Sequence, residues 1–313
     1  MVEQGQFEPA AQTVLRQLAD RDAPELRDFA LRLAEAAERA GQGTLAVDLA
    51  RAVADQGASP RALMQLSRMA LARGDTATAL AHLREALQLA PHAEDLLAAY
   101  GRVLLGNGSP AAAITPFEAL MRMHPLEVQY PYLLGIAWMQ VGDMVNAVEV
   151  LEVARSLEPE RPLTLIALGL AFNNQKRYTE ARDALRLALR YAPENIEALA
   201  ALAESEAGLD NPAEGEALAR RVLALGSDHS TANLVLGMVL FERGELAEAR
   251  QALERSVAKS PSVKAHYQLS LVCARLGDRE ASKFHLDAYR KALGDREARV
   301  LAVRGQTPNQ ENP

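Results

Sequence analysis

Histidine and cysteine are the residues that could ligate a metal ion or act as nucleophiles in this 313-residue chain. No two of its six histidines are four residues apart, the spacing that brings two imidazoles to one side of a helix for zinc. His266 and His285 fall on different predicted helices, where a chance approach is more common than a ligand pair. The single cysteine, Cys273, occupies an apolar helical position, which is typical of a small buried hydrophobic residue. The sequence therefore predicts no metal site and no cysteine nucleophile.

Other catalytic patterns are missing from the sequence as well. Glycines fall mostly at predicted turns or helix contacts, so no glycine-rich loop is available to cradle a phosphate. Without predicted strands there is no strand-bounded nucleophile elbow. The sequon at 107–109 is followed by Pro110, and nothing else indicates a glycosylated secreted protein. We therefore expect a protein that is not an enzyme and has no cofactor.

The composition narrows the fold class and the partners. Apolar residues make up 49% of the chain, charged residues 24% and aromatic residues 4%. Ala, Leu, Glu and Arg dominate, and these residues favour helices over the β-branched and aromatic surfaces of a sheet. The formal net charge of −7 gives no electrostatic support for nucleic-acid binding. One cysteine excludes an intrachain disulfide framework.

A 34-residue period runs through most of the chain and indicates how its helices are arranged. Prolines recur in one phase of it at Pro91, Pro125, Pro159, Pro193 and, two periods later, Pro261. Small residues recur in other phases at Gly101, Gly135, Gly169 and Gly237, at Ala79, Ala113, Ala147, Ala181 and Ala249, and at Gly74, Gly108, Gly142 and Gly244. A period of this length is the sequence signature of a repeat architecture.

One copy of the period explains its physical meaning. Residues around 134–141 have helical apolar spacing, and Gly142 supplies a left-handed cap that ends this helix. A second helix follows from about Val145, and Pro159 ends it. Gly135 and Ala147 are small, so the two antiparallel helices can approach closely. One such hairpin cannot bury its own apolar face, so successive hairpins must stack.

These residues resemble the tetratricopeptide repeat (TPR) family, and the Ala- and Arg-rich composition resembles bacterial members. The best copy of the family pattern reads Leu165, Leu168, Gly169, Phe172, Ala181, Leu185, Ala188 and Pro193. The next reads Leu134, Gly135, Trp138, Ala147, Leu151, Ala154 and Pro159. The resemblance implies an all-α, right-handed superhelical solenoid of stacked antiparallel helix pairs, with an inner groove lined by the first helix of each pair.

The period predicts a single solenoid over residues 1–296. It consists of eight repeats, at about 27–59, 60–93, 94–127, 128–161, 162–195, 196–229, 230–262 and 263–296. Ala10, Val14 and Leu18 are spaced by four and predict a half repeat before the first pair. The polar extension 297–313 is predicted to be mostly disordered.

The repeat at 196–229 departs from the pattern. Ala203 replaces the close-packing glycine, Glu206 stands at the aromatic position, and Gly215 replaces the small alanine of the second helix. We expect Glu206 to be solvated or paired.

The offsets of groove positions in TPR repeats identify candidate peptide-binding residues. They are Arg68, Arg102, Tyr132, Ile136, Met139, Gln140, Ile166, Leu170, Asn173, Asn174, Met238, Phe241, Tyr267 and Leu271. The apolar members are expected to form a patch, and the amides to bond the main chain of a guest. The alternative is that these side chains pack on neighbouring helices. Arg68 and Arg102 lack the asparagine partners of a carboxylate clamp, so we do not expect a terminal carboxylate to be the ligand.

The predicted function is a protein–protein interaction scaffold or adaptor that binds a peptide segment or a partner helix in its groove. The alternative is a self-associating structural subunit of a multiprotein assembly, such as an envelope or export complex, joined through the solenoid ends. The expected partner is a protein or peptide, with no nucleic acid and no membrane insertion. The start of the chain carries no signal peptide, which predicts a cytoplasmic location, or a periplasmic or anchored one if a further segment precedes it.

Overall fold

The computed structural model describes residues 7–20, 23–57, 59–226 and 228–305, and within these ranges it contains helices and turns but no strand. The helix contacts divide the chain into two compact units, residues 1–123 and 124–313. The sequence predicted one solenoid, and we describe each unit by itself.

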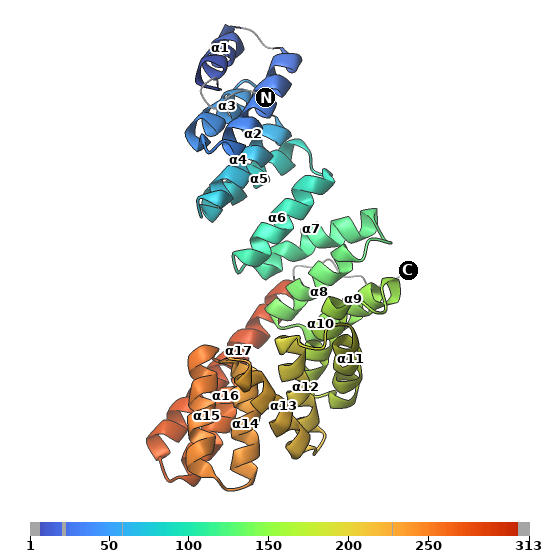
Figure 1. The fold of residues 1–313 in the computed structure, drawn as a ribbon, viewed down its shortest axis with the longest axis vertical. Helices are drawn as coiled ribbons and strands as arrows, with labels where there is room; N and C mark the ends of the chain where they lie inside the picture. Colours follow the sequence, from blue (N-terminus) through green and yellow to red (C-terminus); the bar gives the residue numbers. More distant parts are fainter. Residues whose placement is uncertain (1–6, 21–22, 58, 227, 306–313) are drawn as a thin grey trace. The chain divides into compact units, whose positions relative to one another are not determined.

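Unit 1 contains a single helix followed by three helical hairpins (Figure 1). Its helices are α1 (Phe7–Asp20), α2 (Pro24–Arg39), α3 (Gly43–Asp55), α4 (Pro60–Ala72), α5 (Thr76–Leu89), α6 (Glu94–Gly106) and α7 (Pro110–Met123). Each hairpin packs most extensively within itself, and α3 and α5 also pack on the hairpin that follows. This is the stacking that the 34-residue period predicted.

Unit 2 continues with five hairpins, of which the last has an extended second helix (Figure 1). Its helices are α8 (Gln129–Val141), α9 (Met144–Leu157), α10 (Pro162–Asn174), α11 (Tyr178–Tyr191), α12 (Ile196–Gly208), α13 (Pro212–Ala224), α14 (Ser230–Glu242), α15 (Leu246–Lys259), α16 (Val263–Arg275) and α17 (Arg279–Arg304).

The recurring glycines allow close approach within the hairpins, as the sequence indicated. A Cβ atom on Gly135 would lie 2.5 Å from Cγ of Leu151, and one on Gly101 would lie 2.8 Å from the Phe117 ring. Both partners are fully buried. A methyl group at these glycines would therefore force the two helices of the hairpin apart.

The irregular repeat at 196–229 compensates for its substitutions. A Cβ on Gly215 would lie 2.9 Å from the carbonyl oxygen of Ala203, so the glycine has moved to the second helix while the close contact is kept. Glu206 is 1% exposed and accepts hydrogen bonds from Arg186 at 2.7 Å and from Asn211 at 3.0 Å. The carboxylate is thus buried and paired, which is one of the two outcomes expected from sequence.

The first helix of unit 1 is amphipathic. Phe7, Ala11, Val14 and Leu18 are buried against the following hairpin. Its exposed positions include Glu8, Gln12, Arg16 and Gln17. The buried face of α1 therefore continues the apolar spine of unit 1, and its other face is polar.

The end of the chain differs from the sequence prediction. Residues 297–304, expected to belong to a mostly disordered extension, form the last two turns of the 26-residue helix α17. Val303 in this segment is only 7% exposed. The prediction failed here because polarity was read without the contacts that this helix makes with residues far earlier in unit 2; residues 306–313 lie outside the described part.

Candidate functional site

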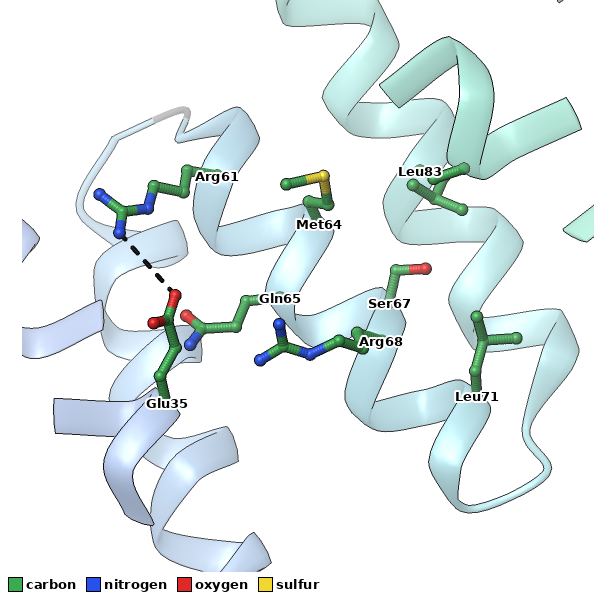
Figure 2. A pocket seen from close by; sticks show the side chains of 9 residues that line it. Glu35, Arg61, Met64, Gln65, Ser67, Arg68, Leu71 and Leu83 are labelled. Atoms are coloured by element: carbon green, nitrogen blue, oxygen red, sulfur yellow. Dashed lines mark ion pairs between the residues drawn. The ribbon is translucent and has the colours of Figure 1, made fainter. Parts of the chain in front are cut away.

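A pocket of about 280 Å³ opens on the first helices of unit 1 (Figure 2). Its apolar wall comes from α4, α5 and α6, and its polar wall from α2 and α4. The lining residues are Glu35, Arg61, Met64, Gln65, Ser67, Arg68, Leu71, Leu83 and Ala99. This volume is slightly below the roughly 300–1,000 Å³ of small-molecule sites. It suits one or two amino-acid side chains better than a whole cofactor.

Gln65 gives this pocket a buried polar group. Its side chain leaves α4 toward α2, as do those of Arg61 and Arg68 (Figure 2). The residue is 5% exposed, and its Nε2 donates to the carbonyl oxygen of Leu31 at 3.1 Å. Among the described residues, none donates a hydrogen bond to its Oε1. Exchanging the amide oxygen and nitrogen would set two oxygens against each other, so the acceptor is the group left without a partner.

Ion pairs between α2 and α4 neutralise the arginines at the pocket rim. Arg61 lies 2.5 Å from Asp28 and 3.8 Å from Glu35. Arg68 lies 2.6 Å from Glu38. Because each arginine already faces a carboxylate, the pocket has no strong preference for an anionic guest. The expectation that no terminal carboxylate binds stays a prediction.

The predicted residues of unit 1 differ in their relation to the pocket. Arg68 lines it, whereas Arg102 is exposed on α6 and is not among the lining residues. Sequence analysis did not select Gln65. The sequence held no clear signal for it: the equivalent positions are Ala99, Leu133, Ala167, Ala201 and Val235 in the middle repeats but Gln268 in the last one. A polar residue at this position is therefore not peculiar to the repeat that forms the pocket.

The structure brings the predicted residues of unit 2 together in two groups. Tyr132, Ile136, Met139 and Leu170 pack on the apolar cluster that contains Ile166. Met238 and Phe241 pack on a separate cluster farther along the unit. The apolar members Ile136, Met139, Leu170, Met238, Phe241 and Leu271 are half-buried, while Gln140, Asn174 and Tyr267 are exposed.

Two of the predicted groove residues are buried against neighbouring helices. Ile166 is 7% exposed and Asn173 is 1% exposed. The Asn173 side chain donates to the carbonyl oxygen of Ala201 at 2.7 Å and accepts from the Ser205 hydroxyl at 2.8 Å, so it joins α10 to α12. For these two positions the structure supports the alternative of packing on neighbouring helices. The exposed Asn174 donates to Leu170 of its own helix at 3.0 Å.

Each aromatic side chain among the predicted groove residues is in contact with another side chain of the protein. The guanidinium of Arg161 lies 4.9 Å from the ring centre of Tyr132, and that of Arg275 lies 5.5 Å from Phe241. The rings of Tyr267 and Tyr289 have centres 5.2 Å apart. Desolvation raises the pKa of Tyr132, so its hydroxyl stays neutral at physiological pH.

Lys264 of α16 connects helices that are distant in sequence. Its ammonium donates to the carbonyl oxygen of Asn173 at 3.0 Å and pairs with Glu204 on α12. The first helices α10, α12 and α16 therefore face one another across a surface that the chain itself bridges.

The last helix returns to the α8–α9 turn. Arg304 donates from Nε and Nη2 to the Asp143 carboxylate at 2.6 and 2.9 Å, and Arg296 donates to the Gly142 carbonyl oxygen at 3.1 Å. Burial opposes ionisation of Asp143, but the bonds from Arg304 and from the backbone N–H groups of Asn146 and Val145 outweigh it. The pKa of Asp143 is consequently below its ordinary value of 3.8.

The chemistry-bearing side chains of the last hairpin meet more closely than sequence suggested. His266 and His285 have their Nδ1 atoms 3.1 Å apart, and burial lowers the pKa of both imidazoles. Cys273 is fully buried, and burial raises its pKa, which makes it a poor nucleophile. Across the described ranges, no three His, Cys, Asp or Glu side chains gather to hold a metal ion. Within the same ranges, no helix has both the length and the apolar content to span a bilayer.

Solved structures share the fold of this chain. A tetratricopeptide repeat protein from Parabacteroides merdae is 12% identical with a TM-score of 0.61, covering 79% of this chain and 98% of its own. The complex titled APC/C hetero-tetramer Cut9-Hcn1 contains a chain 16% identical with a TM-score of 0.57, covering 86% of this chain and 53% of its own. At these identities the likeness concerns the fold alone. No curated protein matches the sequence.

A family comparison covers most of the chain. The model described as Cilia and flagella-associated protein 70 C-terminal domain, a TPR model, matches residues 9–271. This range includes the pocket of unit 1 and all of the predicted groove residues. The matched range covers most of the chain and contains the period and its hairpins. The chain therefore belongs to this family of tetratricopeptide repeat proteins.

Proposed function

We propose that this protein is a scaffold that binds a segment of a protein partner on its first helices, with the pocket of unit 1 as an anchoring point. The observation that carries the proposal is the buried Oε1 of Gln65, which lacks a described donor in a pocket with an apolar wall. A buried acceptor without a partner costs about 1–3 kcal/mol. A guest that supplies an N–H group removes this cost.

The pocket walls define the chemistry of the guest. Met64, Leu71 and Leu83 offer an apolar surface for one side chain, and Met adapts its shape to different guests. A main-chain N–H of an extended segment is the proposed donor to Gln65, whose covered Oε1 turns into the pocket to accept it. Because the rim arginines are paired, the guest segment is expected to be uncharged where it enters the pocket.

The inner residues of unit 2 form a second candidate surface, considered by itself. Ile136, Met139 and Leu170 remain half-exposed on α8 and α10, and Gln140 presents an exposed amide beside them. Apolar side chains rimmed by polar groups are typical of interaction sites. We therefore keep these positions as candidate contacts, and leave out Ile166 and Asn173, which are buried.

Capture of partners by the full chain tests the proposal. The tagged protein is incubated with lysate of its source organism, and bound proteins are quantified by mass spectrometry. The pocket variant Met64→Asp/Leu71→Asp is expected to lose at least tenfold of the partner signal, because a carboxylate in the pocket must remain hydrated. Leu89→Asp, at an exposed position of α5, is the control that keeps capture.

Two further variants locate the contact. Gln65→Leu keeps the shape of the pocket wall but leaves the guest N–H without an acceptor, so we expect binding to weaken about fivefold or more. Ile136→Asp, Leu170→Asp and Met238→Asp combined are expected to abolish capture if the partner spans unit 2. Unchanged capture by both the pocket variant and this triple variant, with helicity intact by circular dichroism, would refute the proposed function.

Self-association is the second function that the sequence left open. The described exposed positions of α1 are mainly polar, whereas α17 exposes Phe284 and Leu301, so an apolar contact between copies is proposed only through α17. Light scattering across a concentration series separates the two functions. A scaffold for a different protein keeps a constant mass, and a self-associating subunit gains mass with concentration.

A further inference from the structure

The C-terminal part of α17, residues 290–304, crosses back to a hairpin that lies about 150 residues earlier in unit 2. We name this segment the strap. Directly before the strap, Tyr289 contacts Tyr267 of α16, and at the end of the strap Arg304 pairs with Asp143. At about 1.5 Å per helical residue, the strap spans roughly 22 Å between these contacts. The first of these contacts involves Tyr267, a position that the sequence had assigned to the groove.

Three strap side chains make the contact with the α8–α9 turn. Arg296 lies against Gly142, and Arg304 forms a bidentate ion pair with Asp143. Val303, next to Arg304 in the helix, is buried. These residues occupy positions i, i+7 and i+8, which lie on one face of a helix. The pattern on this face is therefore Arg-x6-Val-Arg.

The turn is shaped to receive this face. Gly142 has a left-handed backbone with φ of 101°, and a Cβ there would lie 2.8 Å from Cγ of Arg296. The glycine thus both ends α8 and leaves room for the arginine. The Asp143 side chain is 2% exposed, so its charge is buried under Arg304. A buried carboxylate of this kind needs a cationic partner in every folded state in which it stays buried.

We propose that the α8–α9 turn is a docking site for a helix with the pattern Arg-x6-Val-Arg, and that the strap occupies it until a partner helix with the same pattern takes its place. The proposal rests on the proposed function in one respect: it assumes that the chain binds protein segments. It adds the chemistry of one such segment, a basic amphipathic helix, and a competition within the chain that controls access to α8.

A synthetic fluorescent peptide of residues 285–305 serves as the probe in trans. In the unaltered full chain the strap competes at a high effective concentration, so we expect weak binding of the peptide. In the full-chain variant Arg296→Glu/Arg304→Glu the strap is released, and fluorescence anisotropy should show at least tenfold tighter binding. Arg299→Glu, at an exposed position of the same helix, is the control that should bind as weakly as the unaltered chain.

A second change identifies the turn as the receptor. Asp143→Asn added to the released variant keeps an N-cap residue for α9 but removes the charge, and should abolish the gain in peptide binding. Asp75→Asn, at the equivalent position of unit 1, should leave the gain intact. Hydrogen exchange of amides 290–304 should be at least tenfold faster in the released variant than in the unaltered chain.

Three results would overturn the proposal: equal peptide binding by the unaltered and released chains, a gain that survives Asp143→Asn, or a concentration-dependent dimer that exchanges α17 between copies. These results leave the pocket variants of unit 1 untouched. Conversely, loss of the proposed scaffold function in capture experiments would leave the peptide measurement unchanged, so the two failures are distinguishable.

Discussion

The hairpin at 60–93 in unit 1 and the hairpin at 128–161 in unit 2 are the same unit of sequence, 68 residues apart. Gly74 and Gly142 both end their first helix with positive φ, and Asp75 and Asp143 both cap the next helix by accepting an N–H bond. No described atom lies within 4 Å of a Cβ placed on Gly74, whereas one on Gly142 would meet Arg296. Asp75 is exposed, and Asp143 is 3% exposed.

This difference shows what the repeat determines and what it leaves open. The local conformation of the turn follows from glycine and aspartate at fixed offsets, and it is the same in both hairpins. The surroundings of the turn come from residues far away in sequence. In unit 1 the first helices keep a pocket on their surface, and in unit 2 the chain bridges and straps the corresponding region.

Alanine at the two capping glycines gives the largest expected effect. Gly74→Ala costs about 1–2 kcal/mol because a Cβ disfavours the left-handed conformation. Gly142→Ala pays the same cost and also displaces Arg296, so we expect a larger loss and faster exchange of the strap amides. Urea denaturation and hydrogen exchange measure both. An equal decrease in the free energy of unfolding for both variants, with the strap amides unaffected by Gly142→Ala, would mean that the Arg296 contact does not contribute to stability.

The helix contacts of the two hairpins should respond differently to alanine. Gly135→Ala is expected to lose up to about 2 kcal/mol, because overpacking against Leu151 costs roughly 1–3 kcal/mol and helix propensity offsets at most about 1 kcal/mol. The equivalent residue in unit 1 is Ser67, which already has a side chain. Ser67→Ala should change stability by less than about 1 kcal/mol. Chemical denaturation of the two single variants compares the sites.

Acid should loosen the strap of unit 2, because its buried carboxylate loses its charge. The pKa of Asp143 is lowered in the folded chain, so its ionised form stabilises the strap above the ordinary value of 3.8, and this contribution is lost as pH falls through the lowered pKa. The Arg304 Nε–H resonance in ¹⁵N NMR should move toward a solvent-exposed position below about pH 4. In Asp143→Asn this titration should disappear. A transition unaltered by that variant would contradict the assignment.

The smallest effect is expected at the rim of the pocket. Arg68 and Glu38 are partly exposed, so their ion pair is screened by solvent. Arg68→Ala should reduce the free energy of unfolding by less than about 1 kcal/mol. Thermal melting checks this value. A loss above about 2 kcal/mol would show that the α2–α4 contact depends on charge rather than on apolar packing.

Sequence predicted the hairpins because their determinants are local and repeated. Glycines at helix contacts, glycine caps and terminating prolines act within one 34-residue unit, so copies reinforce one another. The Asn173 and Ile166 positions illustrate what local offsets miss. Both have groove spacing, but Asn173 bonds to α12 and Ile166 packs into a core cluster, so neither is free for a guest.

The strap was beyond sequence reasoning for a different reason. Its contacts join residues 154 and 161 positions apart, and nothing in a period of 34 specifies such pairs. Gln65 was missed because polarity at its repeat position does not single it out: the last repeat has Gln268 there. What distinguishes Gln65 is its burial and its hydrogen bond to the carbonyl oxygen of Leu31, which depend on the packing of α4 on α2.

The return of α17 to α8 has a consequence for how unit 2 comes apart. In an open stack, a terminal hairpin can fray and the rest unzip in sequence, because each repeat depends only on its neighbours. The Arg304–Asp143 ion pair joins the last described hairpin of unit 2 to its first one, so these two hairpins depend on each other directly. Unit 2 should therefore melt in a single cooperative step, whereas an untied stack would lose its hairpins one after another.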